Sequence, residues 1–140
     1  MKRGGFGALL VLILFSAFLL SGCSQNPKDF TVKVRCESTG IYQIFYTCYI
    51  DGESCGMGGM ADLNGGEITA ETDLTLTFTE SYLEGKDISR FAIDFSPYGK
   101  DDTSEIATTE KVYIDAEYGN TYTVVFSGDE DSEFTAQLQD

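Results

Sequence analysis

The fold of this protein is decided by the stretch FTVKVRC, residues 30–36, in which apolar and polar side chains alternate strictly. The apolar positions are Phe30, Val32, Val34 and Cys36, and the polar positions between them are Thr31, Lys33 and Arg35. Successive side chains of a β-strand point to opposite faces of the sheet. The pattern therefore predicts a strand with one buried face and one solvated face.

Four further segments show the same alternation: DLTLTFT (73–79), FAIDF (91–95), KVYIDA (111–116) and EFTAQLQ (133–139). Two others, IYQIFYTCYI (41–50) and TYTVVF (121–126), are apolar or aromatic on both faces, which predicts interior strands. Glycine-rich or acidic turns separate these segments, and no stretch of a dozen residues has a helical stripe. We expect an all-β domain, a sandwich of seven or eight short antiparallel strands, with a small β-barrel as the alternative.

The segment EYGNTYTVVF, residues 117–126, favours an immunoglobulin-like version of the sandwich. It resembles the turn and tyrosine that enter the sixth strand of immunoglobulin domains. The resemblance implies that the Tyr122 hydroxyl hydrogen-bonds back across the corner. Val124 stands where an immunoglobulin domain has its second cysteine, and the chain has no tryptophan.

The beginning of the chain reads MKRGGFGALLVLILFSAFLLSGC, with Lys2 and Arg3 ahead of an uncharged stretch at residues 6–20. This stretch is shorter than the roughly 20 residues that a helix needs to span a bilayer, and a basic head with a short apolar body is typical of a secretory signal. The sequence LSGC, residues 20–23, resembles the lipobox of bacterial lipoproteins. The resemblance implies that Cys23 carries a diacylglyceryl group and becomes the mature N-terminus.

This interpretation divides the chain into a signal peptide (1–22), a lipidated cysteine with a short tether (23–29) and a β-sandwich domain (30–140). The protein would then face outside the cytoplasm, on the cell membrane or, as Ser24 suggests by the same resemblance, on an outer membrane. A tether of six residues reaches about 20 Å.

The charge and composition narrow the function. After Cys23 the chain has seven basic and 23 acidic residues, a formal net charge of −16, which argues against nucleic acid as a partner. Histidine is absent, so the commonest general base is missing, and we expect no enzyme. The sequence predicts a binding or accessory module of the cell envelope, attached to the membrane by lipid and directed at a protein or glycan partner.

Three cysteines remain after Cys23. Residues 38–40 could form the turn of a first hairpin. In that hairpin Cys36 lies near Tyr42 and Cys48 lies near Phe30, so Cys36 and Cys48 are too far apart to form a disulfide. If Ile50 pairs with Cys55 across the next turn, Cys48 and Cys55 lie diagonally on one face. A Cys48–Cys55 disulfide and three reduced or unpaired thiols are the two alternatives.

Two stretches contain candidate metal ligands. The loop GESCGMGGMAD, residues 52–62, holds Cys55, Met57 and Met60, whose sulfur atoms suit cuprous copper. Its alternative is a bulged, glycine-rich sheet edge whose methionines fill the mouth of the core. The run GDEDSE, residues 128–133, places Asp129, Asp131 and Glu133 at alternate positions, as calcium ligands can be, or forms a solvated hairpin tip.

Tyrosines on a sheet face are a further candidate site. Exposed rings such as Tyr42, Tyr46 or Tyr49 could bind a protein or sugar, or the same rings could belong to an aromatic core. The sequence leaves open which face of their strand is outward.

Overall fold

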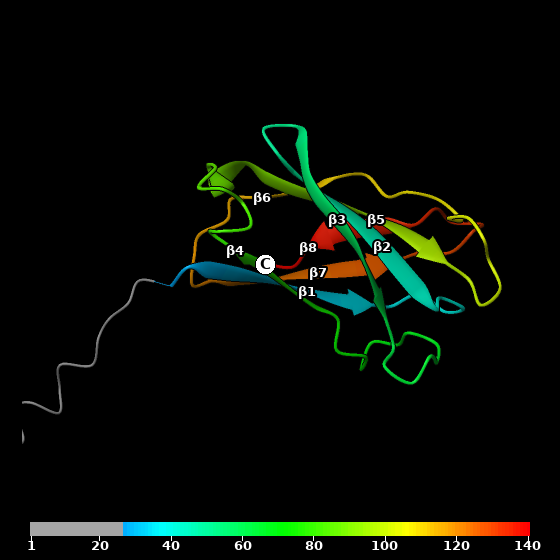
Figure 1. Ribbon diagram of the computed structural model, residues 1–140. Coiled ribbons are helices and arrows are strands. Elements are labelled where there is room, and N and C mark those ends of the chain that lie inside the picture. Colours follow the sequence, from blue (N-terminus) through cyan, green and yellow to red (C-terminus); the bar gives the residue numbers. More distant parts are fainter. Residues whose placement is uncertain (1–26) are drawn as a thin grey trace, which may run out of the picture.

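The computed structural model describes residues 27–140, which form two four-stranded sheets packed face to face (Figure 1). The predicted signal peptide and Cys23 lie outside the described residues. Sheet A has the strand order β4-β1-β7-β8 and sheet B the order β3-β2-β5-β6. The elements are β1 (Asp29–Cys36), β2 (Gln43–Ile50), β3 (Glu53–Ala61), β4 (Thr75–Thr79), the 3-10 turn η2 (Ile88–Arg90), β5 (Phe91–Tyr98), β6 (Val112–Ile114), β7 (Thr121–Ser127) and β8 (Thr135–Leu138).

The predicted sandwich is confirmed, and because the two sheets stay separate within residues 27–140, the barrel alternative is wrong. Five strand pairings are antiparallel, whereas β1 and β7 pair in parallel. A long stretch of chain separates these two strands, so no tight turn requires them to run in opposite directions. The strands β2 and β7 are interior strands of their sheets, as predicted.

The expected hairpin between the first two strands is wrong. The chain after Cys36 leaves sheet A, and β2 belongs to sheet B, so Cys36 and Cys48 lie in opposite sheets rather than at two ends of one hairpin. Both strands have an apolar face to bury, and two facing sheets bury both faces against one shared core.

The core lies between the sheets and contains the predicted inward residues. The apolar residues of β1 are at most 3% exposed, and the residues predicted to face inward in β4, β5 and β6 are also buried. Phe91 of sheet B packs against Phe30 and Phe78 of sheet A, with ring centroids 5.1 Å and 4.8 Å apart. The inward pattern weakens in β8, where Leu138 is 39% exposed.

The tyrosine corner predicted from the immunoglobulin resemblance is present. The Tyr122 hydroxyl accepts a hydrogen bond from the Glu117 backbone N–H (2.9 Å) and donates one to the Asp115 carbonyl (3.2 Å). Tyr122 belongs to β7, and the two backbone groups belong to the connection from β6. The side chain therefore links sheet A to the segment that leaves sheet B.

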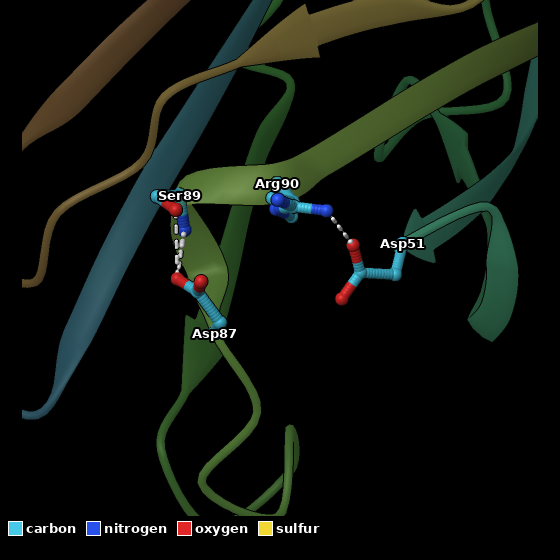
Figure 2. Close-up of polar contacts among 4 residues, drawn as sticks. All are labelled: Asp51, Asp87, Ser89 and Arg90. Atoms are coloured by element: carbon cyan, nitrogen blue, oxygen red, sulfur yellow. Dashed lines mark hydrogen bonds and ion pairs between the residues drawn. The ribbon is translucent and has the colours of Figure 1, made fainter.

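A tight turn joins β2 to β3. Its two central residues, Asp51 and Gly52, both have positive φ angles (54° and 81°), as a type I′ hairpin turn requires. The Arg90 guanidinium donates a hydrogen bond to Asp51 Oδ1 (2.7 Å), which connects this turn to η2 (Figure 2). At the start of η2, Asp87 Oδ1 accepts hydrogen bonds from the Ser89 N–H and hydroxyl, and the pKa of Asp87 is lowered mainly by the bond from the hydroxyl.

Candidate binding face

The outer surface of sheet B carries a group of large side chains that we call the aromatic face. Strand register places them together: Thr47 of β2 is opposite Met57 of β3, and Ala92 of β5 is opposite Tyr113 of β6. Side chains on the same face of a sheet alternate with inward ones, so every second residue of each strand contributes. The aromatic face consists of Phe45, Tyr49, Met57, Tyr98 and Tyr113.

Three members of the aromatic face are strongly exposed. Tyr113 and Met57 are each 75% exposed, and Phe45 is 44% exposed. Tyr49 and Tyr98 are half-buried. Single exposed apolar residues are common on protein surfaces, whereas several large ones on the same sheet face make that face a candidate interaction site.

The Phe45 ring is held in place from two sides. Its centroid lies 5.1 Å from that of Tyr98, with the two ring planes tilted by 56°. On the other side it lies over Gly59 of β3, where an added Cβ would come within 3.2 Å of ring atom Cε1. A larger residue at position 59 would therefore displace the ring. The Tyr98 hydroxyl also donates a hydrogen bond to Glu105 Oε2 (3.2 Å).

Polar groups surround Tyr49 within the aromatic face. Its hydroxyl donates a hydrogen bond to Asp94 Oδ2 (2.9 Å), and the Lys111 ammonium lies 3.6 Å from the centroid of its ring. Burial raises the pKa of Tyr49, and the hydrogen bond to Asp94 raises it further because that bond stabilises the neutral phenol. Asp94 is only 7% exposed, so this hydrogen bond supplies a partner to a nearly buried carboxylate.

The sequence named three tyrosines of this region, and the structure separates them. Tyr49 lies on the aromatic face, whereas Tyr46 points inward and its ring is 6.3 Å from that of Phe78. Tyr42 is half-buried just before β2. The sequence analysis did not single out Phe45, Tyr98 or Tyr113. The alternation of Tyr113 with the inward Val112 and Ile114 was the available signal.

The sulfur residues of the predicted copper loop belong to strand β3, so the expected loop is a strand. β3 lies at the edge of sheet B and carries a bulge opposite Cys48, which agrees with the bulged edge of the alternative, although only one of its two methionines faces the core. Met60 is 8% exposed and faces the core, while Met57 is 75% exposed on the outer face. The structure therefore does not bring Cys55, Met57 and Met60 together around one point.

Cys48 and Cys55, in contrast, are adjacent. Ile50 pairs with Glu53 and Tyr49 with Ser54, so the expected pairing of Ile50 with Cys55 is wrong. The tighter turn makes Cys55 the extra residue of the bulge, next to Gly56, which is the register partner of Cys48. Both are free thiols in the structure, with their Sγ atoms 3.0 Å apart.

The acidic residues of the predicted calcium site surround the turn between β7 and β8. Asp129 Oδ1 accepts hydrogen bonds from the backbone N–H groups of Asp131 and Ser132 and from the Ser132 hydroxyl. These bonds lower the pKa of Asp129, the hydroxyl bond most strongly, and they show that this carboxylate stabilises the turn. Asp131 and Glu133 are exposed at the same turn.

Residues 27–140 contain neither a cluster of metal ligands nor a membrane-spanning helix. No three cysteine, aspartate or glutamate side chains in this range come together in a group that could hold a metal ion. The same range contains no helix that is long and apolar enough to cross a membrane.

Comparison with known proteins gave few matches. No protein-family model and no curated protein matches the chain. An NMR structure of a protein from Eubacterium rectale is 10% identical, and the match covers 83% of this chain and 91% of that one with a TM-score of 0.38. The membrane-binding domain of pneumolysin is 17% identical over 80% of this chain and 93% of that one, with a TM-score of 0.28. Neither likeness is close enough to support a statement about function.

Proposed function

We propose that this protein is a lipoprotein anchored outside the cytoplasm through Cys23, and that it acts as a non-enzymatic binding module of the cell envelope. The aromatic face of sheet B is the surface that contacts its partner. The observation that carries the binding role is the grouping of Phe45, Met57 and Tyr113, all exposed, on one outer sheet surface.

The nature of these side chains favours a protein as the partner. Aromatic residues and methionine are enriched in the centres of protein interfaces, and tyrosine is common among the residues that contribute most to affinity. The tilt of 56° between Phe45 and Tyr98 leaves these two rings out of one plane, which is a poor platform for stacking a flat sugar ring. A glycan is therefore the second candidate.

The charge of the mature chain favours a basic surface on the partner. With a formal net charge of −16 after Cys23, the protein attracts positively charged surfaces and repels anionic polymers and lipids. Such long-range attraction mainly raises the association rate and is screened by salt.

Photochemical crosslinking in the native cell tests the binding role. A photoreactive phenylalanine analogue replaces Tyr113 on the aromatic face or, as a matched control, Thr77, an exposed residue on the outer face of sheet A. We expect irradiation to give a discrete protein adduct from position 113 and none from position 77. Equal adducts from both positions, or none from position 113, would contradict the proposed surface.

The lipid anchor has a separate test. Cys23→Ser removes the sulfur that the diacylglyceryl group would occupy, so we expect the variant to lose labelled fatty acid and membrane association. A Cys36→Ser variant, altered at a buried cysteine of the domain, should keep both. A Cys23→Ser protein that still incorporates fatty acid would overturn the anchor.

A further inference from the structure

We propose that Cys48 and Cys55 form a disulfide in the native protein, which covalently joins edge strand β3 to β2 at the bulge, and that Cys36 stays free. The oxidising surroundings in which such a bond persists follow from the proposed extracytoplasmic location. The pairing itself is argued from the geometry of the hairpin.

The bulge brings the two cysteines into bonding range. β2 pairs Tyr49 with Ser54 on one side of the bulge and Cys48 with Gly56 on the other, so Cys55 is the extra residue opposite Cys48. The register partner of Cys48 is Gly56, the residue after Cys55, and the bulge leaves the sulfur atoms of Cys48 and Cys55 in contact. The Sγ atoms, 3.0 Å apart, need to approach by only about 1 Å to reach bonding distance.

Among the cysteines of residues 27–140, the contact between two sulfur atoms is that of Cys48 with Cys55. Cys36 is the third, and it lies in sheet A with its thiol donating to the Ser38 carbonyl (3.7 Å). It is 1% exposed, so a second protein chain has no access to it. Of the three pairs that Cys36, Cys48 and Cys55 allow, the structure therefore favours Cys48–Cys55.

The different exposure of the two sulfurs suggests an order of reaction. Cys48 is fully buried, whereas Cys55 is half-buried and is the sulfur that solvent reaches. Burial raises the pKa of the Cys48 thiol, so Cys48 is a poor first nucleophile.

Thiol–disulfide exchange with a disulfide-bonded oxidant accounts for the bond. The Cys55 thiolate attacks the oxidant's disulfide, which forms a mixed disulfide and releases one oxidant thiol. The Cys48 sulfur then attacks Cys55 Sγ, and its proton passes to the second oxidant sulfur as that leaves. The two cysteines lose two electrons and two protons, and the oxidant is reduced from one disulfide to two thiols.

Peptide mapping tests the pairing at residue level. The full-length protein is extracted from its membrane without reductant, its free thiols are alkylated under denaturing conditions, and it is cut by a protease that cleaves after glutamate. Cleavage after Glu37, Glu53 and Glu67 puts Cys36, Cys48 and Cys55 on three different fragments. We expect fragments 38–53 and 54–67 to be joined before reduction and separate after it, with Cys36 alkylated throughout.

Three variants sharpen the result. Cys55→Ser should make Cys48 alkylatable without reduction, Cys48→Ser should do the same for Cys55, and the control Cys36→Ser should keep the linked pair. Alkylation of both Cys48 and Cys55 in the unreduced parent, or a link from either of them to Cys36, would overturn the proposal. Cys23 lies on the same fragment as Cys36, because Glu37 is the first glutamate of the chain, and the added mass of a diacylglyceryl group on that fragment is distinct from that of the alkylating group. A link between Cys48 and Cys55 without the lipid mass would refute the anchor alone.

Discussion

The outer faces of the two sheets differ sharply, although both belong to the same sandwich. The outer face of sheet B carries the aromatic face, whereas that of sheet A is made mainly of threonines, with charged and other polar residues and one half-buried valine. The sheet A residues are Asp29, Thr31, Lys33, Arg35, Thr75, Thr77, Thr79, Thr121, Thr123, Val125, Ser127, Thr135 and Gln137. Threonine suits a strand exposed to water because its branched side chain has a high β-propensity and its hydroxyl is solvated.

This difference shows which features folding requires and which it does not. Both sheets bury a continuous apolar inner face, so the core accounts for that half of each pattern. Sheet A shows that a threonine-rich outer face is sufficient for this sandwich. The exposed rings of sheet B are therefore not explained by folding, and a partner that covers them is the simplest reason for their presence.

The largest expected effect tests whether the two sheets depend on one core. Phe91→Ala removes a fully buried ring that contacts both Phe30 and Phe78 of sheet A, and we expect it to lower the free energy of unfolding by about 3–5 kcal/mol. Urea unfolding followed by circular dichroism measures this change. Tyr113→Ala, which truncates a side chain 75% exposed on the aromatic face, should change the free energy by less than about 0.5 kcal/mol.

The core prediction would be contradicted by two separate unfolding transitions in the parent. Such behaviour would mean that the sheets are independent, and their outer faces could then not be compared as two sides of one cooperative unit.

The next largest effect concerns the edge of sheet B. Cys48 and Cys55 close a short loop, and a disulfide across it stabilises the folded state by about 2 kcal/mol in the chain-entropy treatment. We therefore expect a reductant to lower the melting temperature of the parent by roughly 10 °C. Cys36→Ser should show the same drop, whereas Cys55→Ser should melt at one temperature with or without reductant. If the reductant leaves the melting temperature of the parent unchanged, Cys48 and Cys55 are not bonded. The edge of sheet B then has no crosslink, like the edges of sheet A.

The alternation of apolar and polar residues was sufficient to predict the strands that have one clear apolar face. The inward residues of β1, β4, β5 and β6 were predicted, because a polar residue between each pair of apolar ones leaves a single way to bury the strand. Strand β3 was predicted only as a bulged, glycine-rich sheet edge, the alternative to a metal-binding loop, because its glycines carry no side chain to show alternation. The parallel pairing of β1 with β7 is a long-range choice that no local turn signal encodes.

The candidate site was harder to predict than the fold. In β2 the neighbours Phe45 and Tyr46 are both aromatic, so only the register decides which one is outward, and a shift of one residue would exchange them. The cysteine pair was predicted with the wrong register, since the sequence does not reveal that the turn has only two central residues. The bulge then brought Cys55 closer to Cys48 than the expected diagonal arrangement.

A smaller effect tests the link between the two sheets at the tyrosine corner. Tyr122→Phe removes the two hydrogen bonds to backbone groups of the connection from β6 and a longer one from the Asn120 side chain (3.5 Å), and we expect a loss of about 1–2 kcal/mol in the free energy of unfolding. Tyr118→Phe is a matched control in the same connection, because the Tyr118 hydroxyl is buried with no hydrogen-bond partner within residues 27–140. Its removal should be neutral or slightly stabilising. Equal losses in both variants would show that packing, not hydrogen bonding, makes the corner.

The smallest effect is a pH dependence that belongs to the aromatic face. In the unfolded chain the Tyr49 phenol ionises near pH 10, whereas in the folded protein burial and the hydrogen bond to Asp94 raise its pKa. The folded state thus favours the neutral phenol, and the resulting stability is fully present below pH 10 and is lost as the pH rises through the folded pKa.

Urea unfolding of the parent and of Tyr49→Phe from pH 8 to pH 11.5 isolates this contribution. We expect the variant to be less stable by about 1 kcal/mol at pH 8, where Asp94 loses its donor, and the difference to shrink as the pH rises above 10. Tyr113→Phe, which removes a hydroxyl from a side chain 75% exposed, should follow the parent at every pH. If the difference in free energy of unfolding between the parent and Tyr49→Phe stays constant with pH, the Tyr49 hydroxyl acts only through packing. The hydrogen bond from Tyr49 to Asp94 would then contribute no more to stability than the solvated threonines of sheet A do.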